Sequence, residues 1–383
     1  MRIVIVGSYP LSADLIKGGV ESSVFGLANE LSKENDVDVL DYPRIGGRDL
    51  VEQCGKFAIH RYANIGKHNR DASLREKDII RDIIALHPDV IHIHGSGQLS
   101  LAIYNATSDY GIKTIVTIHG LVHEEKKKAL RKCPTPKLLY QYIYQSRIEM
   151  KLLDVVEYVI VDTLYVANRI RHYYSKGRIK HLPRIYVIPQ GISSEYFNIN
   201  CDERNTILLS VGAMSPRKGH LLTLEAYQLL RAHGTQAKLR ILGSLADKKH
   251  YSKLLDTISK NPYKEDISLE TNVSQQELYD AYKSANIFVL HSEEESQGIV
   301  FAEAMATGMP IVATKVGGIE DVVESGKTGF LCEYGDTETM AEMIERLLTD
   351  RKLWKMYSLY AKQISHAYDW QEIGKQIVQL YNV

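Results

Sequence analysis

The chain has 383 residues, of which 44% are hydrophobic and 25% are charged, a composition typical of a globular protein. A single core stops growing at about 250 to 300 residues, so we expect two domains. The 47 basic and 47 acidic side chains cancel, which argues against a general attraction to polyanions, and we expect no nucleic-acid partner.

Neither the cysteines nor the N-terminus indicates a secreted or membrane-spanning protein. The four cysteines lie far apart, without CxxC or Cys/His ligand spacing, which argues against a disulfide framework and a structural zinc site. The apolar run Ile3–Val6 is too short for a signal peptide or a membrane span, and no later run reaches 18 apolar residues. We therefore expect a cytoplasmic protein, which at most lies on a membrane surface.

Short runs rich in Val and Ile alternate with amphipathic segments, the pattern of parallel strands joined by crossover helices. The predicted elements of the first half are a strand at 3–7, a helix at 19–32, a strand at 37–41, a helix at 72–86, and strands at 90–94, 114–119, 158–162 and 185–189, the later strands being separated by helical stretches. This half is expected to form one doubly wound sheet.

The same pattern restarts at Thr206. It predicts a strand at 207–211, a helix at 220–232, a strand at 238–242, a helix at 250–259, a strand at 267–270, a helix at 275–285, a strand at 287–290, a helix at 298–307, a strand at 310–313, and helices at 337–348 and 370–381. The segment 189–205 between the halves has the Gly, Ser and Asn content of a linker.

The expected fold is therefore α/β, with two Rossmann-like domains. We place them at residues 1–195 and 196–365, followed by a C-terminal helical segment at 366–383. Ligands of such sheets bind beyond the carboxyl ends of the strands, so we expect the two domains to face each other across a cleft that holds the active site.

The glycine-rich turns do not match a nicotinamide-binding site. The first strand continues into Gly7-Ser8-Tyr9-Pro10, and the second half opens with Gly212-Ala213-Met214-Ser215-Pro216. Neither turn has the GxGxxG spacing that cradles a dinucleotide, which argues against hydride transfer.

The segment from Glu295 to Pro310 has a pattern that suits a nucleotide diphosphate. It follows a strand with an acidic loop, a glycine at a helix start (Gly298), a second glutamate on that helix (Glu303), and Gly-x-Pro before the next strand. The amides at a helix N-terminus favour a diphosphate. Glu303 lies five residues after Gly298, about 7.5 Å along the axis, roughly the reach from a phosphate to a ribose.

This Glu-x7-Glu segment resembles that of the retaining GT-B glycosyltransferases of family 4 (glycosyl transferases group 1), which includes many enzymes of bacterial surface polysaccharides. Further segments resemble motifs of the same family in the same order: Gly18-Gly19-Val20-Glu21, Thr117-Ile118-His119-Gly120, Ile188-Pro189-Gln190-Gly191-Ile192, and Val211 to Gly219 as the phosphate loop. The resemblance covers nearly the whole chain and implies the GT-B fold, with the last helix crossing back to the N-terminal domain.

The resemblance also implies roles for particular residues and a reaction without a metal. Glu295 and His119 would be the catalytic residues beside the donor sugar. The donor-binding residues would be Gly18 and Gly19, which let the backbone approach the phosphates, Lys218 and Arg217 at the diphosphate, Gly298, Ile299 and Val300 through their backbone, and Glu303 at the ribose.

Two positions depart from the family pattern. Ala213 stands where an arginine commonly follows the first glycine of the phosphate loop, and Gln190 replaces the usual asparagine. Either Arg217 supplies the second positive charge or the diphosphate is bound more weakly.

Two possible metal motifs have simpler interpretations. His92 and His94 alternate on one strand face, but no third ligand stands at a workable spacing, and we interpret them as a partly buried histidine pair. Asp36-Val37-Asp38 resembles the Asp-x-Asp of metal-dependent glycosyltransferases, and we interpret it as polar residues at the edge of a strand. We therefore expect neither a metal nor another cofactor.

Residues 113–151 form a basic segment inside a neutral chain. They contain nine Lys or Arg and three Glu, a local net charge of +6, together with Tyr140, Tyr142 and Tyr144. One interpretation is peripheral contact with anionic lipid or with a lipid-linked diphosphate acceptor. The other is a solvated helix face in which Glu124 and Glu125 pair with Lys128.

The sequence predicts a retaining glycosyltransferase that moves a sugar from a nucleotide-diphosphate sugar to a hydroxyl of a saccharide or lipid-linked acceptor, in bacterial surface polysaccharide or glycolipid synthesis. Two alternatives remain, a GT-B nucleotide-sugar epimerase and a non-catalytic GT-B partner subunit, the second because Ala213 interrupts the phosphate loop.

Overall fold

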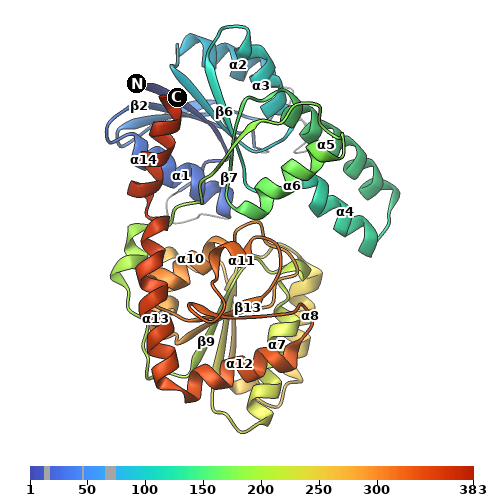
Figure 1. Cartoon of the computed structure of the whole chain (residues 1–383), viewed down its shortest axis with the longest axis vertical. Helices are drawn as coiled ribbons and strands as arrows, with labels where there is room; N and C mark the ends of the chain where they lie inside the picture. Colours follow the sequence, from blue (N-terminus) through green and yellow to red (C-terminus); the bar gives the residue numbers. More distant parts are fainter. Residues whose placement is uncertain (13–17, 45–46, 65–74) are drawn as a thin grey trace. The chain divides into compact units, whose positions relative to one another are not determined.

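The computed structural model describes residues 1–12, 18–44, 47–64 and 75–383. The chain folds into two compact units, each built around its own parallel sheet. Unit 1 contains residues 1–11, 19–190 and 373–383, and unit 2 contains Gly191–Glu372 together with the described residues Ser12 and Gly18. The prediction of an α/β protein with two parallel-sheet domains is confirmed (Figure 1).

Unit 1 has an eight-stranded sheet in the order β3-β4-β2-β1-β5-β6-β7-β8, parallel except for β3. Its strands are β1 (Arg2–Gly7), β2 (Asp36–Asp41), β3 (Leu50–Cys54), β4 (Phe57–Arg61), β5 (Val90–His94), β6 (Lys113–Ile118), β7 (Tyr158–Val161) and β8 (Arg184–Val187). The strand order reverses between β1 and β5. Every strand predicted in this half is present, whereas the β3–β4 hairpin was missed because its short strands carry charged residues among the apolar ones.

The described residues of unit 1 that precede Gly191 also form six α-helices. They are α1 (Gly19–Leu31), α2 (Glu76–Ala85), α3 (Gln98–Ser108), α4 (Val122–Lys132), α5 (Pro136–Val155) and α6 (Leu164–Ser175). The helix predicted at 72–86 starts outside the described residues, and its described part is α2. Local sequence sets several helix starts: before α5, the Thr135 hydroxyl accepts a hydrogen bond from the Leu138 amide and Pro136 occupies the first turn.

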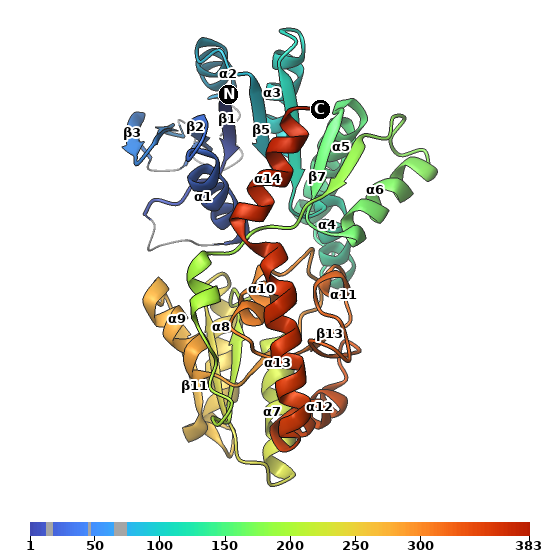
Figure 2. The same ribbon diagram turned by 60° about the vertical axis from the view of Figure 1, so that its left-hand side comes forward.

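The last helix, α14 (Trp370–Tyr381), lies against the sheet of unit 1 with its C-terminal half (Figure 2). The Tyr381 hydroxyl lies 2.6 Å from His92 Nδ1, and Lys113 Nζ donates to the carbonyl of Leu380 at 2.7 Å and to that of Tyr381 at 3.1 Å. Lys113 therefore binds the orphan carbonyls at the end of α14, where a positive charge stabilises a helix.

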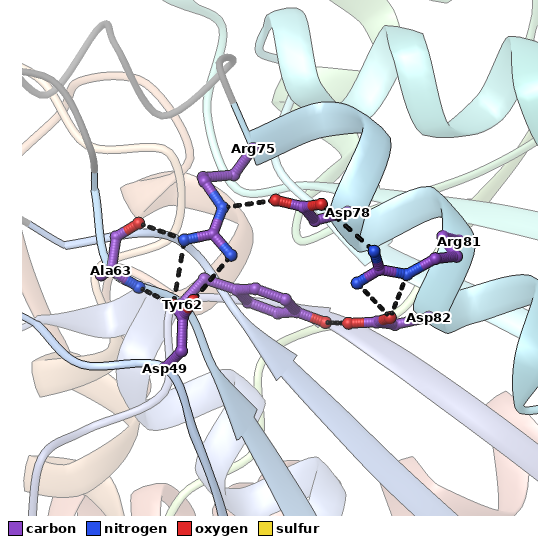
Figure 3. A network of polar contacts seen from close by, with 7 residues as sticks. All are labelled: Asp49, Tyr62, Ala63, Arg75, Asp78, Arg81 and Asp82. Carbon is purple, nitrogen blue, oxygen red and sulfur yellow. Dashed lines mark hydrogen bonds and ion pairs between the residues drawn. The ribbon is translucent and has the colours of Figure 1, made fainter.

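A polar network joins the start of α2 to the loops flanking the β3–β4 hairpin (Figure 3). The Arg75 guanidinium donates to both carboxylate oxygens of Asp49, at 3.0 and 2.9 Å, and to the carbonyl of Ala63 at 3.0 Å. About two turns further along α2, the Asp82 carboxylate accepts from the Tyr62 hydroxyl at 3.0 Å. Bidentate pairing of this kind fixes the direction of both partners, so it orients α2 on the sheet.

Unit 2 has a six-stranded, fully parallel sheet in the order β11-β10-β9-β12-β13-β14, with the reversal between β9 and β12. Its strands are β9 (Ile207–Val211), β10 (Lys238–Gly243), β11 (Ile267–Thr271), β12 (Ile287–Leu290), β13 (Ile311–Thr314) and β14 (Gly329–Cys332). Its helices are α7 (His220–Ala232), α8 (Lys248–Ser259), α9 (Gln275–Ser284), α10 (Ile299–Ala306), α11 (Ile319–Val322), α12 (Thr337–Thr349) and α13 (Arg351–Ser365). All strands and helices predicted here are present, and β14, α11 and α13 were not predicted.

Buried apolar side chains of the central strands form the core of each unit. In unit 2, β12 is buried along its whole length and packs against α10, of which Phe301, Ala302 and Met305 are fully buried. The small residues Ala302, Ala304 and Ala306 allow α10 to lie close to its neighbours. This packing holds the first turn of α10 beside the carboxyl end of β12.

Candidate functional site

Two loops of unit 2 meet at the reversal of its sheet order, the place where parallel α/β sheets bind ligands. The first loop follows β9 and contains Gly212, the 3-10 turn Pro216–Lys218 and Gly219 before α7. The second follows β12, contains Glu295 and leads into α10. The strands pair directly, and the amide of Glu293 donates to the carbonyl of Arg217 at 2.8 Å. The backbone thus joins the two loops.

Lys218 and Glu295 form a buried ion pair between these loops. Lys218 Nζ binds Glu295 Oε1, which also accepts a hydrogen bond from the Ser292 hydroxyl at 2.8 Å. Both side chains are about nine-tenths buried. The methylene chain of Lys218 packs over Gly212, where an added Cβ would lie 3.4 Å from Lys218 Cδ. Two residues 77 positions apart in the sequence are therefore brought into contact, as expected of parts of one site.

Glycines without room for a side chain hold the two loops in place. Gly219 has φ +63° and an added Cβ would lie 1.8 Å from the carbonyl oxygen of His291, while Gly317 has φ +59° and would meet the carbonyl oxygen of Glu295 at 2.1 Å. Gly318 donates its amide to that same Glu295 carbonyl at 2.9 Å. Only glycine adopts this conformation at no steric cost while allowing such an approach.

We expect Gly317→Ala to destabilise the protein and to weaken nucleotide binding, because the new methyl group must displace the backbone of Glu295. The matched control is Gly335→Ala, since Gly335 has φ +93° but nothing within 4 Å of an added Cβ. The control carries the conformational cost alone, about 1 kcal/mol. Thermal unfolding of both variants measures the difference, and equal destabilisation would show that the Glu295 contact is unimportant.

The helix α10 begins close to the side chain of Glu295. Gly298 has φ +76°, and an added Cβ there would lie 3.6 Å from Glu295 Cγ and 2.6 Å from the ring of Phe301. The next two residues, Ile299 and Val300, form the first helical turn, whose amides have no acceptor within the helix. Lys218, Glu295, Gly298, Ile299 and Val300 are thus brought together at one end of the sheet, where an anion would meet a cation and a helix N-terminus.

Glu303 lies further along the same helix, in an aromatic environment. Its Oε2 accepts a hydrogen bond from the Tyr282 hydroxyl at 2.8 Å. Burial raises the pKa of Glu303 to about 7, although hydrogen bonds from Tyr282 and Tyr196 act in the opposite direction. A carboxyl group with a pKa near neutrality is typical of functional sites, and sequence analysis could not detect this because Tyr196 and Tyr282 are distant in the chain.

The remaining residues of the phosphate loop are placed differently from Lys218. Arg217 is exposed, and its guanidinium group forms no hydrogen bond or ion pair with any residue that the structure describes. Ala213 lies between Gly212 and Met214, whose amides donate to the carbonyls of Leu242 and Ser244. The loop therefore presents one buried cation, already paired, and one exposed cation.

The predicted residues of unit 1 form a second polar cluster at the carboxyl ends of its strands. His119 follows β6, and its Nδ1 lies 3.2 Å from the Asp162 carboxylate, while Gln190 Nε2 donates to the same carboxylate at 2.7 Å. An added Cβ on Gly19 would lie 3.3 Å from Gln190 Oε1, so Gly19 belongs to this cluster. Gly18 precedes α1 and is exposed, with open space around it.

Sequence analysis missed Asp162 and gave His94 no role at this cluster. Asp162 is buried, and its Oδ2 lies 3.2 Å from His119 Nδ1. Gln190 Nε2 lies 3.0 Å from the same ring nitrogen, and His94 Nδ1 lies 2.9 Å from His119 Nε2. These three residues hold the His119 ring through both of its nitrogens. A signal for Asp162 was available, since it directly follows β7, and β7 pairs with β6, the strand that His119 follows.

The two possible metal motifs make hydrogen bonds within unit 1. His92 binds the Tyr381 hydroxyl and the Thr117 hydroxyl through its two ring nitrogens, and both His92 and His94 are buried. Asp36 is exposed at the first position of β2, whereas Asp38 is buried and accepts from His60 at 2.9 Å, so the interpretation as edge polarity is wrong for Asp38. Within the described parts of the chain, no three His, Cys, Asp or Glu are grouped so as to hold a metal ion.

Two family models match consecutive parts of the chain. The model described as "Glycosyltransferase Family 4" matches residues 17–196, and the model described as "Glycosyl transferases group 1" matches residues 193–364. The first therefore covers most of unit 1, and the second covers the loops that hold Lys218, Glu295 and Glu303.

Several curated proteins are similar to this chain. The chain is 38% identical over 279 residues to N-acetyl-alpha-D-glucosaminyl L-malate synthase of Bacillus anthracis, covering 69% of this chain and 66% of the relative. It is 25% identical over 305 residues to lipopolysaccharide 1,2-N-acetylglucosaminetransferase of Salmonella typhimurium, covering 78% and 74%. A 36% identical match to sulfoquinovosyl transferase SQD2 of Arabidopsis thaliana covers 38% of this chain and only 30% of the relative.

Solved structures share the fold across the full length. Sucrose-phosphate synthase from Thermosynechococcus elongatus has a TM-score of 0.81 at 20% identity, covering 100% of this chain and 98% of the other. Anabaena Alr3699/HepE, solved with UDP and glucose, has a TM-score of 0.72 at 16% identity, with 100% and 99% covered. At these identities the likeness shows the fold alone.

Proposed function

The chain belongs to the family 4 glycosyltransferases with the GT-B fold, and from this premise we propose that it transfers a sugar from a nucleotide-diphosphate sugar to a hydroxyl acceptor with retention of configuration. The observation that carries the proposal is the Lys218–Glu295 pair beneath the first turn of α10. A nucleotide diphosphate suits the positive charge of Lys218, for which it would compete with Glu295, and the amides of the first turn of α10. The distance along the helix from these amides to Glu303 suits a ribose.

In the proposed reaction, the bond between the anomeric carbon and the diphosphate oxygen breaks through an oxocarbenium-like transition state. The leaving diphosphate gains negative charge, which Lys218 and the first-turn amides of α10 stabilise more strongly than they stabilise the bound donor. A diphosphate oxygen accepts the proton of the acceptor hydroxyl as the new glycosidic bond forms on the same face. Because Lys218 and these amides supply the positive charge, we propose that no metal ion is required.

We propose further roles for the other predicted residues. Glu295 positions the donor sugar together with the backbone of Gly298, Ile299 and Val300, and Arg217 supplies a second cation to the diphosphate. Gly18 and Gly19 leave space for the donor phosphates. His119 contacts the donor sugar, and a sugar hydroxyl that binds its Nε2 must replace His94 there.

The comparisons support a nucleotide-sugar donor and a saccharide or lipid-linked acceptor. Anabaena HepE has been solved with UDP and with UDP-glucose, and the Salmonella relative acts on lipopolysaccharide. We therefore propose a role in bacterial surface polysaccharide or glycolipid synthesis. We also propose that the enzyme works in the cytoplasm at the inner face of the membrane, although none of its described helices is long and apolar enough to cross a bilayer.

A thermal-shift panel with UDP, GDP and ADP tests the donor class. A ligand at 100 times its dissociation constant adds about 2.7 kcal/mol to the state that binds it, so the matching nucleotide should raise the unfolding midpoint by a few degrees. Transfer from the corresponding donor should survive EDTA, and NMR of the product should show the donor's anomeric configuration. No shift with any nucleotide, or isomerisation of the donor without an acceptor, would contradict the proposal.

A further inference from the structure

We propose that the hairpin formed by α4 and α5 is a docking surface for an anionic lipid bilayer. The two helices are joined by three residues, 133–135, and pack against each other at one side of unit 1 (Figure 1). The inference rests on the proposed function, because it gives a lipid-linked acceptor a place of access. It is supported by three features of the hairpin: an exposed apolar face, a surplus of cations, and acidic side chains that are buried or paired with other residues.

The apolar face lies on the N-terminal half of α5. Leu139, Tyr140, Ile143 and Tyr144 are 46%, 63%, 43% and 46% exposed. Their spacing places them on one side of the helix, and the rings of Tyr140 and Tyr144 stack at 5.9 Å, almost parallel. Four large exposed side chains in two helical turns form an apolar patch of the kind that marks an interaction site.

The hairpin also carries a surplus of cations. Eight of the nine basic residues of the segment belong to the hairpin: Lys126, Lys127, Lys128, Arg131, Lys132, Lys137, Arg147 and Lys151. Arg131, Lys132 and Lys137 are exposed next to the turn, directly before Leu139 and Tyr140. The ninth, Lys113, binds the end of α14 and does not contribute to the surface, and Tyr142 packs against His123 inside the hairpin.

Of the three glutamates in residues 113–151, two are buried or paired and do not add negative charge to this surface. Glu149 is fully buried and accepts hydrogen bonds from the amides of Val122 and His123, at 2.8 and 2.9 Å, and from the Ser96 hydroxyl at 3.0 Å. Glu124 pairs with Arg169 and accepts from the Tyr173 hydroxyl at 2.8 Å. Glu125 is exposed, and Asp154, near the C-terminal end of α5, accepts hydrogen bonds from the amides of Lys180 and His181. Glu124, which we expected to pair with Lys128, has Arg169 as an ion-pair partner.

An anionic bilayer is the partner that fits both features together. Aromatic and aliphatic side chains enter the interface, and each nearby cation adds about 1 kcal/mol of attraction to anionic lipid. Either signal alone gives weak, reversible binding, whereas the two together hold a protein at the surface. A second copy of this chain is disfavoured at the same face, because two sets of cations would be brought together.

The test is sedimentation of the full-length protein with vesicles of phosphatidylcholine alone and with about one third phosphatidylglycerol. We expect binding to the anionic vesicles only. Replacing Arg131, Lys132 and Lys137 with glutamine should reduce binding about 100-fold, at about fivefold per cation. Replacing Tyr140 and Tyr144 with serine should abolish binding at the same lipid concentration.

Matched controls separate this surface from general charge and hydrophobicity. Glutamine at Lys248, Lys249 and Lys253, exposed on α8, removes the same charge, and Leu359→Ser removes an apolar side chain that is 73% exposed on α13. Both controls should bind like the wild type.

Four results would overturn the inference. They are binding retained by either hairpin variant, equal losses in the controls, equal binding to neutral vesicles, and self-association through this face. Nucleotide-induced thermal shifts should be unchanged in the hairpin variants, so a failure of lipid binding is distinguishable from a failure of the proposed function.

Discussion

Replacing Lys218 with methionine should reduce sugar transfer about 10²- to 10³-fold, the range found when one preorganised donor to developing negative charge is removed. Methionine retains the apolar stem that packs over Gly212 but has no charge to offer a leaving diphosphate. The measurement is kcat with the donor identified by the thermal-shift panel. Lys249→Met, at an exposed position of α8, is the control and should be fully active.

The same change should also destabilise unit 2, because it leaves the buried carboxylate of Glu295 with the Ser292 hydroxyl as its hydrogen-bond donor. Breaking a buried pair by removing one partner costs about 3 to 5 kcal/mol. Adding Glu295→Gln removes the uncompensated charge, so the double variant should recover most of the lost stability but none of the activity. Recovery of activity in the double variant, or a fully active Lys218→Met, would show that Lys218 acts only as the counter-ion of Glu295.

Replacing Glu303 with glutamine should weaken nucleotide binding about 10²-fold while making the protein more stable at alkaline pH. An ionised carboxylate accepts hydrogen bonds from two ribose hydroxyls, whereas a glutamine side chain has one neutral carbonyl oxygen. Calorimetric titration of the variant with the matching nucleotide measures the loss. Because burial raises the pKa of Glu303 to about 7, wild-type affinity should also fall as the pH is lowered below 7 and the carboxyl group becomes protonated.

The sign of the stability effect follows from the same pKa. The folded state holds a proton on Glu303 that the unfolded chain releases near pH 4.5. This contribution to stability is complete below pH 4.5 and is lost as the pH rises through about 7. Glutamine has no such dependence, so Glu303→Gln should exceed the wild type by about 1 to 3 kcal/mol at pH 8 and by little at pH 5.

Thermal unfolding at both pH values, with the exposed Glu342→Gln on α12 as control, measures the difference. A variant that is less stable than the wild type at pH 8 would mean that Glu303 is stabilised in its charged form by its tyrosine partners. The pH dependence that we expect for nucleotide binding, which rests on the raised pKa of Glu303, would then be contradicted as well.

Much of the fold could be predicted because parallel strands in the middle of a sheet are buried on both faces. The run Ile287–Leu290 can only be a strand or a buried helix, and its length and its neighbours decide for the strand. The same reasoning fails for the β3–β4 hairpin. Leu50–Cys54 includes exposed Val51 and an edge position, so its strand conformation depends on pairing with β4 rather than on its own pattern.

The spacing of the α10 residues in the candidate site could be predicted from the sequence, whereas the contact between its two loops could not. Gly298 and Glu303 belong to one helix, so their spacing follows from helix geometry and could be anticipated. The contact of Lys218 with Glu295 joins loops 77 residues apart, and only the family resemblance indicated that they belong together. No sequence pattern indicated the burial of Glu149, which changes the surface charge of the hairpin.

The sequence by itself determined the alternation of strands and helices, the two-domain α/β class, and the identity of the residues with useful chemistry, because these depend on local periodicity and residue type. The tertiary structure decided which of these residues are partners. It pairs Lys218 with Glu295, and it brings the Tyr282 hydroxyl into a hydrogen bond with Glu303. It places the Asp162 carboxylate beside His119. It also shows that Lys113, Glu124 and Glu149 have partners or are buried and do not contribute charge to the basic surface. These outcomes depend on the order of strands in each sheet and on burial, which arise only when distant segments pack together.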